Sequence, residues 1–176
     1  MICPDCKADN IPGVDVCASC GHDLQALDLP RAEDEFSEHL INDLLGDVEA
    51  KTALVIEPRM PVALAISLMQ RHANNYVLVK EGGRLLGILT ERDVLLKAAG
   101  EKADLNAITA RQLMSPDPVC LRASDSLAAA LHKMSSGGFR HIPLQERDGT
   151  VSRVVSIRDV FRHVSSFIHK HPASAR

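Results

Sequence analysis

Most of this chain contains one sequence unit twice, at residues 48–100 and 111–168. The stretch Val62-Ala-Leu-Ala-Ile-Ser-Leu-Met69 matches Leu127-Ala-Ala-Ala-Leu-His-Lys-Met134 at an offset of 65 residues. Gly87-Ile-Leu-Thr-Glu-Arg-Asp93 matches Arg153-Val-Val-Ser-Ile-Arg-Asp159 at an offset of 66 residues. The one-residue difference falls in a predicted hairpin, where an insertion costs little. The repeat therefore predicts two copies of one folded unit, related by an approximate two-fold axis.

Each unit is predicted to follow the order β-α-β-β-α, because apolar residues recur first with strand and then with helix periodicity. The first unit has predicted strands at 52–56, 76–80 and 85–89, a helix at 62–73 and a last helix after its final strand. The second has strands at 118–122, 141–145 and 151–155, a helix at 125–135 and a last helix likewise. Ser124 and Asp125 are residue types that cap helix N-termini, so we expect them to begin the helix at 125–135.

Two such units resemble a tandem pair of CBS domains, an arrangement often called a Bateman module. Each unit ends in two hydrophobic residues followed by Ser/Thr-x-x-Asp, and the lead-in Gln112-Leu-Met-Ser-Pro-Asp-Pro-Val119 is similar to that of the family. The resemblance covers roughly residues 40–170. It implies a CBS pair with pseudo-two-fold symmetry, in which clefts between the units hold regulatory ligands.

The Ser/Thr-x-x-Asp signature stands where a predicted strand passes into a helix. Thr90 and Asp93 form it in the first unit, and Ser156 and Asp159 form it in the second. A carboxylate there can accept hydrogen bonds from both hydroxyls of a ribose, and N–H groups at the helix start can face an anion. The resemblance implies that these four residues contact an adenosine nucleotide. The same pattern also caps a helix without any ligand, and this alternative stays open.

Basic residues distinguish the second unit from the first. Arg140 and His141 stand where family members often carry phosphate-binding residues, whereas the first unit has the uncharged Asn75 and Tyr76. The planar guanidinium fork of arginine suits phosphate. We therefore expect the cleft of the second signature to be the better site for a phosphorylated ligand. The alternative for Arg140 is a solvated surface residue.

Apolar side chains of the first predicted strands are expected to hold a flat base between them. The resemblance implies that each site combines the signature of one unit with the first strand of the other. We therefore expect Leu54 beside the second signature and Val119 beside the first, although core packing is the default role of both. Arg153 replaces the signature glycine of the second unit, and its side chain would either block that cleft or add a phosphate contact.

Four cysteines form two short pairs near the N-terminus, Cys3-Pro-Asp-Cys6 and Cys17-Ala-Ser-Cys20. Two Cys-x-x-Cys knuckles place four sulfurs at tetrahedral positions, which suits a structural Zn2+. Residues 1–24 resemble a short zinc ribbon, and Gly21 fits the position after a knuckle that requires positive φ. Two disulfides, a redox pair and a catalytic zinc are the weaker alternatives. The predicted fold class is therefore α+β: a tandem CBS-domain pair preceded by a small four-cysteine zinc ribbon.

His22 and Cys120 are also of residue types that bind metals, but we expect both to have structural roles. We expect His22 to be a polar tip of the second knuckle, not a fifth ligand. Cys120, the fifth cysteine, lies in an apolar strand pattern and is expected to be a buried core residue.

The segment between the cysteines and the repeat is predicted to contain a linker at 25–32 and then an amphipathic helix. Acidic residues at 33–35 precede an apolar stripe at 36–45, and Gly46 marks the expected end of the helix. This stripe requires a partner surface, either the second domain of the chain or another copy of it. The expected domains are a zinc ribbon at 1–24, linker and helix at 25–46, CBS domains at 47–105 and 106–170, and a tail at 171–176.

Charge is distributed unevenly along the chain. Residues 1–46 carry ten acidic and two basic side chains, while the remaining residues carry thirteen acidic and eighteen basic ones. Nucleic-acid affinity depends on cationic contacts to phosphates, so an acidic ribbon makes nucleic acid an unlikely partner. No apolar stretch approaches the roughly 18 residues of a membrane span, and the N-terminus does not read as a secretory signal. We therefore expect a cytoplasmic protein without a membrane segment.

The sequence shows no catalytic constellation, and we expect no enzymatic activity. The primary hypothesis is a regulatory sensor that binds AMP, ADP or ATP in the CBS-pair cleft and relays this to a protein partner. A homodimer through the CBS helices is expected, with the alanine-rich faces at 63–66 and 128–131 in contact. The alternative is an adaptor that binds no ligand, dimerises through the CBS pair and docks proteins through the ribbon. S-adenosylmethionine and NAD-type dinucleotides also present a ribose, so the sequence leaves the ligand open.

Overall fold

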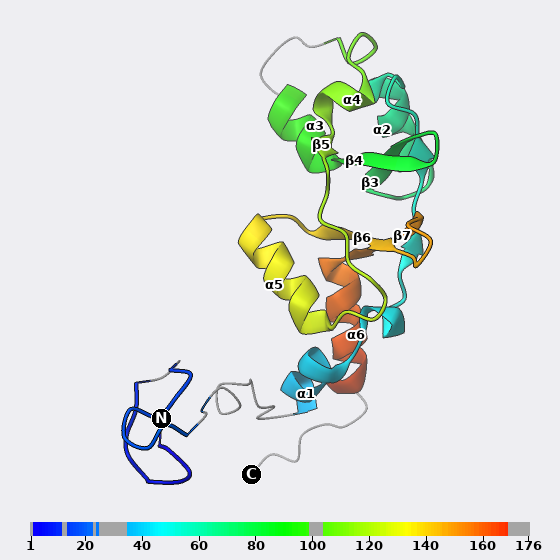
Figure 1. Cartoon of the computed structure of the whole chain (residues 1–176). Coiled ribbons are helices and arrows are strands. Elements are labelled where there is room, and N and C mark those ends of the chain that lie inside the picture. The colour runs from blue at the N-terminus through cyan, green and yellow to red at the C-terminus, as the bar shows by residue number, and fades with distance from the viewer. Residues whose placement is uncertain (1, 12–13, 23, 25–34, 99–103, 169–176) are drawn as a thin grey trace.

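The duplicated sequence forms two α/β units, one stacked on the other (Figure 1). The structure is a computed structural model, and it describes residues 2–11, 14–22, 24, 35–98 and 104–168. The predicted linker at 25–32 and the tail at 171–176 lie outside these residues. No helix in the described ranges is both long enough and apolar enough to cross a bilayer.

The first unit is a four-stranded sheet with helices packed against it. Its strands are β2 (Val55–Ile56), β3 (Tyr76–Glu81), β4 (Arg84–Thr90) and β5 (Ser115–Pro116), in the spatial order β2-β3-β4-β5. Its helices are α2 (Val62–Arg71), α3 (Glu91–Ala98) and α4 (Ala110–Leu113). Apolar residues from α2, α4, β3 and β4 make one buried cluster, so the predicted helix and hairpin of this unit are confirmed.

The second unit repeats this plan with three named strands. They are β1 (Lys51–Thr52), β6 (His141–Gln145) and β7 (Val151–Ser156), in the order β1-β7-β6. The helices α5 (Leu127–Gly137) and α6 (Ile157–Ile168) cover the sheet. Leu121 adds a parallel bridge to Leu144 at the far edge, which corresponds to the parallel pairing of β2 with β3.

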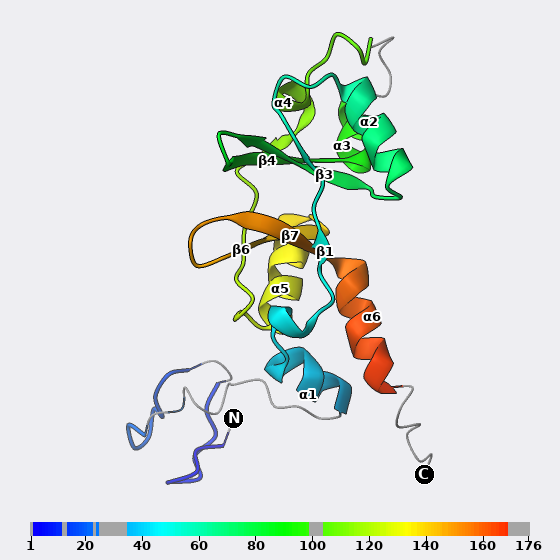
Figure 2. The same ribbon diagram turned by 90° about the vertical axis from the view of Figure 1, so that its right-hand side faces the viewer.

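The segments that lead into the two units cross from one sheet to the other (Figure 2). Residues 51–52 pair with β7 of the second unit, and residues 55–56 then pair with β3 of the first. Residues 115–116 pair with β4 of the first unit, and Leu121 then bridges to β6 of the second. The continuous strands predicted at 52–56 and 118–122 are therefore wrong, because each segment divides its pairing between two sheets.

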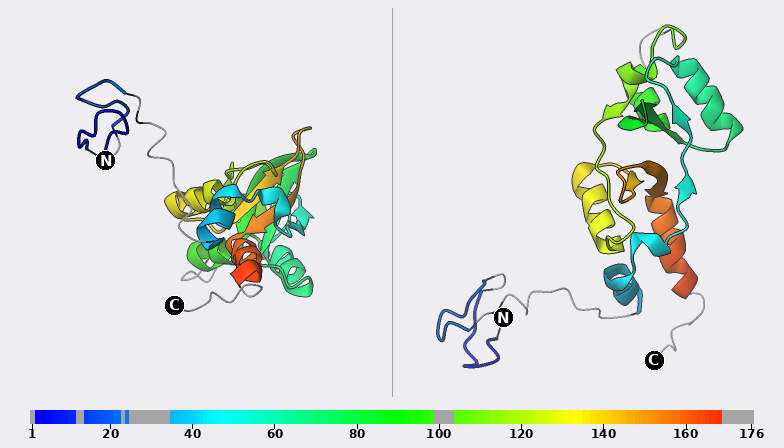
Figure 3. Two further views of the ribbon diagram at one scale, coloured as in Figure 1. Left: turned by 90° about the horizontal axis from the view of Figure 1, so that it is seen from below. Right: turned by 45° about the vertical axis from the view of Figure 1, so that its right-hand side comes forward.

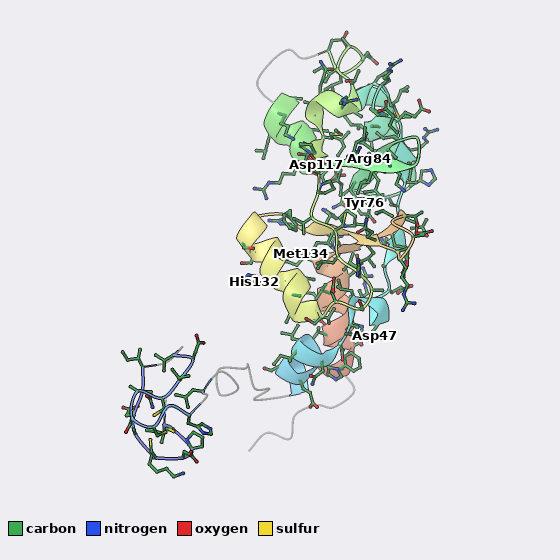
Figure 4. The ribbon with its side chains drawn as sticks, viewed as in Figure 1. Asp47, Tyr76, Arg84, Asp117, His132 and Met134 are labelled. Carbon is green, nitrogen blue, oxygen red and sulfur yellow. The ribbon has the colours of Figure 1, made fainter. Side chains whose placement is uncertain are left out.

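The two sheets face each other, as the right-hand view of Figure 3 shows, and an apolar layer lies between them. Buried side chains from both units form this layer: Ala53, Tyr76, Leu78, Ile88, Val151 and Val154. Tyr76 lies where the two units meet (Figure 4). Cys120 packs against the layer and is half-buried, so it is less enclosed than the sequence pattern suggested.

Helix α1 (Glu35–Asn42) packs on α5 and α6 of the second unit, which decides between the two partner surfaces left open by the sequence. Leu40 lies against the core of that unit, and Leu45 and Val48 are buried in it. The α-helix ends at Asn42 and a single 3-10 turn follows at Leu45–Asp47, so Gly46 does not end α1 as predicted. The acidic residues 33–34 lie outside the described residues.

The start of α5 differs slightly from the prediction. Its N-cap is Ser126, whose Oγ accepts a hydrogen bond from the backbone N–H of Ala129 at 3.2 Å. Ser124 and Asp125 precede the cap, and Asp125 instead accepts a hydrogen bond from the Arg122 N–H at 2.7 Å. The expected caps are therefore wrong by one or two residues, because three candidate residues stand in a row and the local backbone selects the last.

Gly87 provides a test of the crossing geometry, because β5 passes directly over it. A Cβ at this position would lie 2.5 Å from the sulfur of Met114 and 2.8 Å from the carbonyl oxygen of Ser115. We expect Gly87→Ala to reduce the free energy of unfolding by about 1–3 kcal/mol, measured by urea denaturation. Arg153→Ala, at the equivalent position of the second unit, is the control. Equal stability of wild type and Gly87→Ala would contradict the close packing of β5.

Candidate functional site

The two signature turns have nearly the same geometry. In the first unit, Asp93 Oδ2 accepts hydrogen bonds from the backbone N–H of Thr90 at 2.9 Å and from its hydroxyl at 2.6 Å. In the second, Asp159 Oδ2 accepts from the N–H and hydroxyl of Ser156 at the same two distances. Each hydroxyl oxygen also accepts a hydrogen bond from the N–H of its aspartate. One carboxylate oxygen of each pair thus closes the start of a helix, as the capping alternative predicted.

The other oxygen of the first carboxylate, Asp93 Oδ1, is held by the protein itself. Lys97 Nζ lies 2.8 Å from it and the Ser115 hydroxyl lies 2.8 Å from it. Lys97 also donates to the carbonyl oxygens of Leu113 and Met114. Burial acts to raise the pKa of Asp93, but the hydrogen bonds from Lys97, Thr90 and Ser115 outweigh burial and hold the pKa below its usual value.

The outer oxygen of the second carboxylate accepts a hydrogen bond from one side chain, where that of the first accepts from two. Asp159 Oδ1 accepts a hydrogen bond from the guanidinium of Arg162 at 3.1 Å. The Arg162 side chain is 52% exposed, while that of Asp159 is only 6% exposed. An exposed, flexible cation can turn toward a ligand at little cost, so a new donor could replace Arg162 on this oxygen.

A cavity of about 600 Å³ adjoins the first signature. Thr90, Asp93 and Val119 all line it, so the structure brings together the three residues expected there. Val119 is 41% exposed, as a side chain that contacts a ligand would be. The charged side chains of the lining are two cations and three carboxylates: Arg92, Arg140, Glu91, Asp93 and Asp117.

A second cavity, of about 410 Å³, adjoins the second signature. Ser156, Asp159, Arg140 and His141 line it together, in agreement with the expected grouping. Its charged lining consists of four cations and two carboxylates: Lys51, Arg140, Arg158, Arg162, Glu91 and Asp159. The second cavity is therefore the more cationic of the two.

Leu54 and Arg153 do not lie where the sequence placed them. Leu54 packs against the core of the first unit and is not part of the lining of the second cavity. Lys51, three residues earlier, lies in that lining instead. Arg153 lines neither cavity, because its guanidinium is 2.9 Å from the carboxylate of Glu146. Arg153 therefore neither blocks the second cleft nor extends it.

His141 lies between the two cavities and lines both. Its ring is tilted against that of Tyr76, with 4.9 Å between the ring centroids. Burial lowers the pKa of His141 to about 4, and Arg140 and Arg158 act in the same direction against the opposing effect of Asp159. The imidazole is therefore neutral at pH 7 and adds no positive charge to either cavity.

The four cysteines of the N-terminal segment converge. Their sulfur atoms all lie within 4.8 Å of one another, and the Cys3–Cys20 and Cys6–Cys17 pairs are both 3.6 Å apart. Sulfurs around a tetrahedral zinc with bonds of about 2.3 Å would be roughly 3.8 Å apart, so this donor set fits the ion. No disulfide joins these cysteines.

The two knuckles are built alike. The N–H of Cys3 donates to the carbonyl of Ala8, and the N–H of Cys17 donates to that of His22. The residue after each second cysteine has a positive φ, 61° at Lys7 and 73° at Gly21, which confirms the expectation for Gly21. The His22 ring lies 3.4 Å from the carboxylate of Asp5, which agrees with a polar tip of the second knuckle.

A third cluster fastens α1 to α6. The carboxylate of Asp43 lies 3.0 Å from Nδ1 of His39 and 2.8 Å from Nε2 of His163. Phe167 stacks on His39 with 3.7 Å between ring centroids. Burial acts to raise the pKa of Asp43, but the hydrogen bonds from His163 and His39 outweigh it and lower the pKa. No local pattern in the sequence indicates this contact, because His39 and His163 are far apart in the chain.

Comparison with known proteins finds the same family domain in both copies of the repeat. A family model described as "CBS domain" matches residues 45–100 and 110–166, which together make more than half of the chain. The CBS domain-containing protein CBSCBSPB3 of Arabidopsis thaliana is 29% identical over 119 residues, which cover 68% of this chain and 21% of that protein. The chain thus spans only about a fifth of the length of that relative.

Solved structures share the fold. A CBS-domain-containing protein from Agrobacterium tumefaciens is 27% identical, with a TM-score of 0.59 and coverage of 62% of this chain and 87% of that one. CBSX2, solved in complex with AMP, is 20% identical, with a TM-score of 0.62 and coverage of 74% and 100%. Because CBSX2 is only 20% identical to this chain, its likeness shows a shared fold and nothing more.

The Asp43 cluster gives a testable dependence of stability on pH. We expect Asp43→Asn to lower the free energy of unfolding by about 1–2 kcal/mol at pH 7, because hydrogen bonds to a charged group are lost. The folded pKa of Asp43 is depressed, so its contribution is present above the ordinary carboxyl pKa of about 4 and disappears as the pH falls through the lower folded value. The difference between the two proteins in urea denaturation should therefore shrink in acid.

The matched control is Glu38→Gln, which removes an exposed carboxylate from α1, the helix that directly precedes Asp43. It should change stability little at either pH. A loss of stability in Asp43→Asn that is equal at neutral and acid pH would mean that the charge of the carboxylate does not matter.

Proposed function

This chain belongs to the CBS-domain family, and we propose that it is a non-enzymatic regulatory protein that binds an adenosine nucleotide in the second cavity. CBS pairs generally act as regulatory modules without catalytic activity. The observation that carries the proposal is the excess of cations around the Asp159 signature. A nucleotide combines a ribose, which requires acceptors, with phosphates, which require cations. The second cavity offers both in one lining.

The proposed contacts follow from the chemistry of the lining. Asp159 Oδ1 would accept hydrogen bonds from ribose hydroxyls, with Ser156 beside it. Arg140 and Arg162 would bind phosphate through their planar forks, and Lys51 would act as a further point charge. His141, neutral at pH 7, would donate or accept a single hydrogen bond. Among structures with this fold, CBSX2 was solved with AMP, which supports an adenosine ligand.

Relay to a partner would run through α6 and α1. The signature Ser156/Asp159 lies at the N-terminal end of α6, and His163 of the same helix holds Asp43 of the α1 segment. A ligand that shifts α6 would therefore shift the helix that precedes the repeat. Control by the ligand further requires that two arrangements of this contact bind the nucleotide unequally. We propose a protein partner for the N-terminal segment and a homodimer through the CBS helices.

The Cys3, Cys6, Cys17 and Cys20 cluster is proposed to hold a structural Zn2+. Four thiolate positions leave no open coordination site, so the ion would stabilise the fold and not act on a substrate. A segment of about 24 residues cannot bury enough apolar surface to fold alone, so metal binding would supply its folding free energy.

The adaptor without a ligand remains the second candidate, because both signature aspartates already serve as helix caps. The adaptor would keep its function when Asp159 is changed, whereas the sensor would lose it.

Calorimetric titration of the full chain with AMP, ADP and ATP tests the nucleotide site. We expect binding of at least one of them, and Asp159→Asn should weaken it about tenfold or more, because it replaces a charged acceptor of the ribose hydroxyls. Asp117→Asn, which changes a carboxylate of the other cavity, should bind as the wild type does. No heat and no thermal shift with any of the three nucleotides would remove the sensor function.

Metal analysis tests the cysteine cluster. We expect one zinc ion per chain after purification with zinc, and Cys6→Ser should lose most of it, because three thiolates bind zinc much more weakly than four. Cys120→Ser is the matched control, since this cysteine packs against the layer between the sheets. Equal zinc content in both variants would show that the four-cysteine cluster is not the metal site.

A further inference from the structure

We propose that Lys97 occupies the first signature from within the protein, so that each chain binds one nucleotide, at Asp159. Lys97 would then be the residue that decides which of the two duplicated clefts is a nucleotide site. The prediction of one nucleotide per chain rests on the proposed function. The occupation of the first signature by Lys97, here called the closure, concerns only residues of this chain.

The carboxylate of Asp93 has no free position for a sugar. An ionised carboxylate offers about four lone-pair sites, and four donors already approach Asp93. They are the N–H and the hydroxyl of Thr90, the ammonium of Lys97 and the hydroxyl of Ser115. A ribose hydroxyl could bind only by displacing one of them. Displacement of Lys97 would also leave a largely buried carboxylate without its cation.

The ammonium group of Lys97 is equally satisfied. It has three N–H donors, and three acceptors surround it: Asp93 Oδ1, the carbonyl of Leu113 at 2.6 Å and that of Met114 at 3.3 Å. Through these bonds Lys97 links α3 to the end of α4 and the start of β5. Movement of its side chain would therefore break contacts between three elements as well as one ion pair.

The second unit lacks both closing groups at the equivalent positions. The offset of 66 residues that relates Asp93 to Asp159 relates Lys97 to His163, and His163 bonds Asp43 instead. Ser115 lies opposite Ile88 in its sheet, and Lys51 lies opposite Val154 in the other. Lys51 therefore replaces the second closing hydroxyl with a cation that lines the cavity.

Charge agrees with this assignment. The first cavity has three carboxylates and two cations in its lining, which disfavours phosphate. The low pKa of Asp93 keeps the carboxylate ionised at neutral pH, which maintains the pair with Lys97. The Asp93 and Asp159 signatures are alike in sequence, but only the outer oxygen of Asp159 can accept a hydrogen bond from a ligand.

Amine labelling of the wild-type chain tests the closure directly. Lys97 and Lys133 are both exposed, so they differ in hydrogen bonding and not in burial. With an acetylating reagent and peptide mass spectrometry, Lys97 should react about tenfold or more slowly than Lys133, because the ammonium of Lys97 is held by charge-assisted hydrogen bonds. Saturating ATP should leave the rate at Lys97 unchanged. Reaction at Lys97 as fast as at Lys133, or faster in the presence of ATP, would overturn the closure.

Stoichiometry tests the consequence. Calorimetry with ATP should give one site per wild-type chain and a second, weaker site in Lys97→Met. The control Lys133→Met removes an exposed lysine of α5 that lines neither cavity, and it should still give one site. Two sites in the wild type, or one site lost on Asp93→Asn and kept on Asp159→Asn, would overturn the assignment. If no nucleotide binds but Lys97 is protected from labelling, the proposed function fails while the closure holds, so the two failures are distinguishable.

Discussion

The apolar layer between the two sheets determines where the functional parts of the paired units can lie. Tyr76, Leu78 and Ile88 of one sheet meet Val151 and Val154 of the other. Each lead-in segment adds short edge pairings to both sheets, so the units cannot separate without losing hydrogen bonds as well as buried apolar contact. The signature turns lie at the ends of β4 and β7, and each cavity is lined by residues from both units. A ligand in either place would therefore contact the joint between the units and not one unit alone.

Duplication gave the protein two equal turns, and local neighbours have made them unequal. The capping bonds of Asp93 and Asp159 agree closely in length. The side chains that contact the outer carboxylate oxygens differ. Lys97 and Ser115 contact Asp93, whereas the exposed Arg162 contacts Asp159. The electrostatic character of each cleft thus depends on residues outside the signature, and a motif search on the signature alone would treat the clefts as equivalent.

The repeat was sufficient to predict the fold class, two helices in each unit and both hairpins, because apolar periodicity and an internal match constrain each other. The short helix α4 was not predicted. It was not sufficient for the lead-in segments, since a strand that changes partners looks in sequence like one continuous strand. The same dependence on strand pairing decided which site residues could be predicted. Arg140 could be identified from its position in the family pattern, whereas Lys51 depends on a strand register and was missed. Lys97 could have been noticed from its position four residues after Asp93 in a helix. The Asp43 contact depends on helix packing, which no local pattern in the sequence reports.

Arg140 and His141 stand in the walls of both cavities, together with Asn75 and Glu91. This common partition means that the clefts are not separate compartments. An arginine drawn to an anion on one side is withdrawn from the other, and a substitution there alters two environments at once. A substitution in this shared wall that suits one cleft therefore also changes the other. The two copies of the repeat cannot diverge independently at these residues.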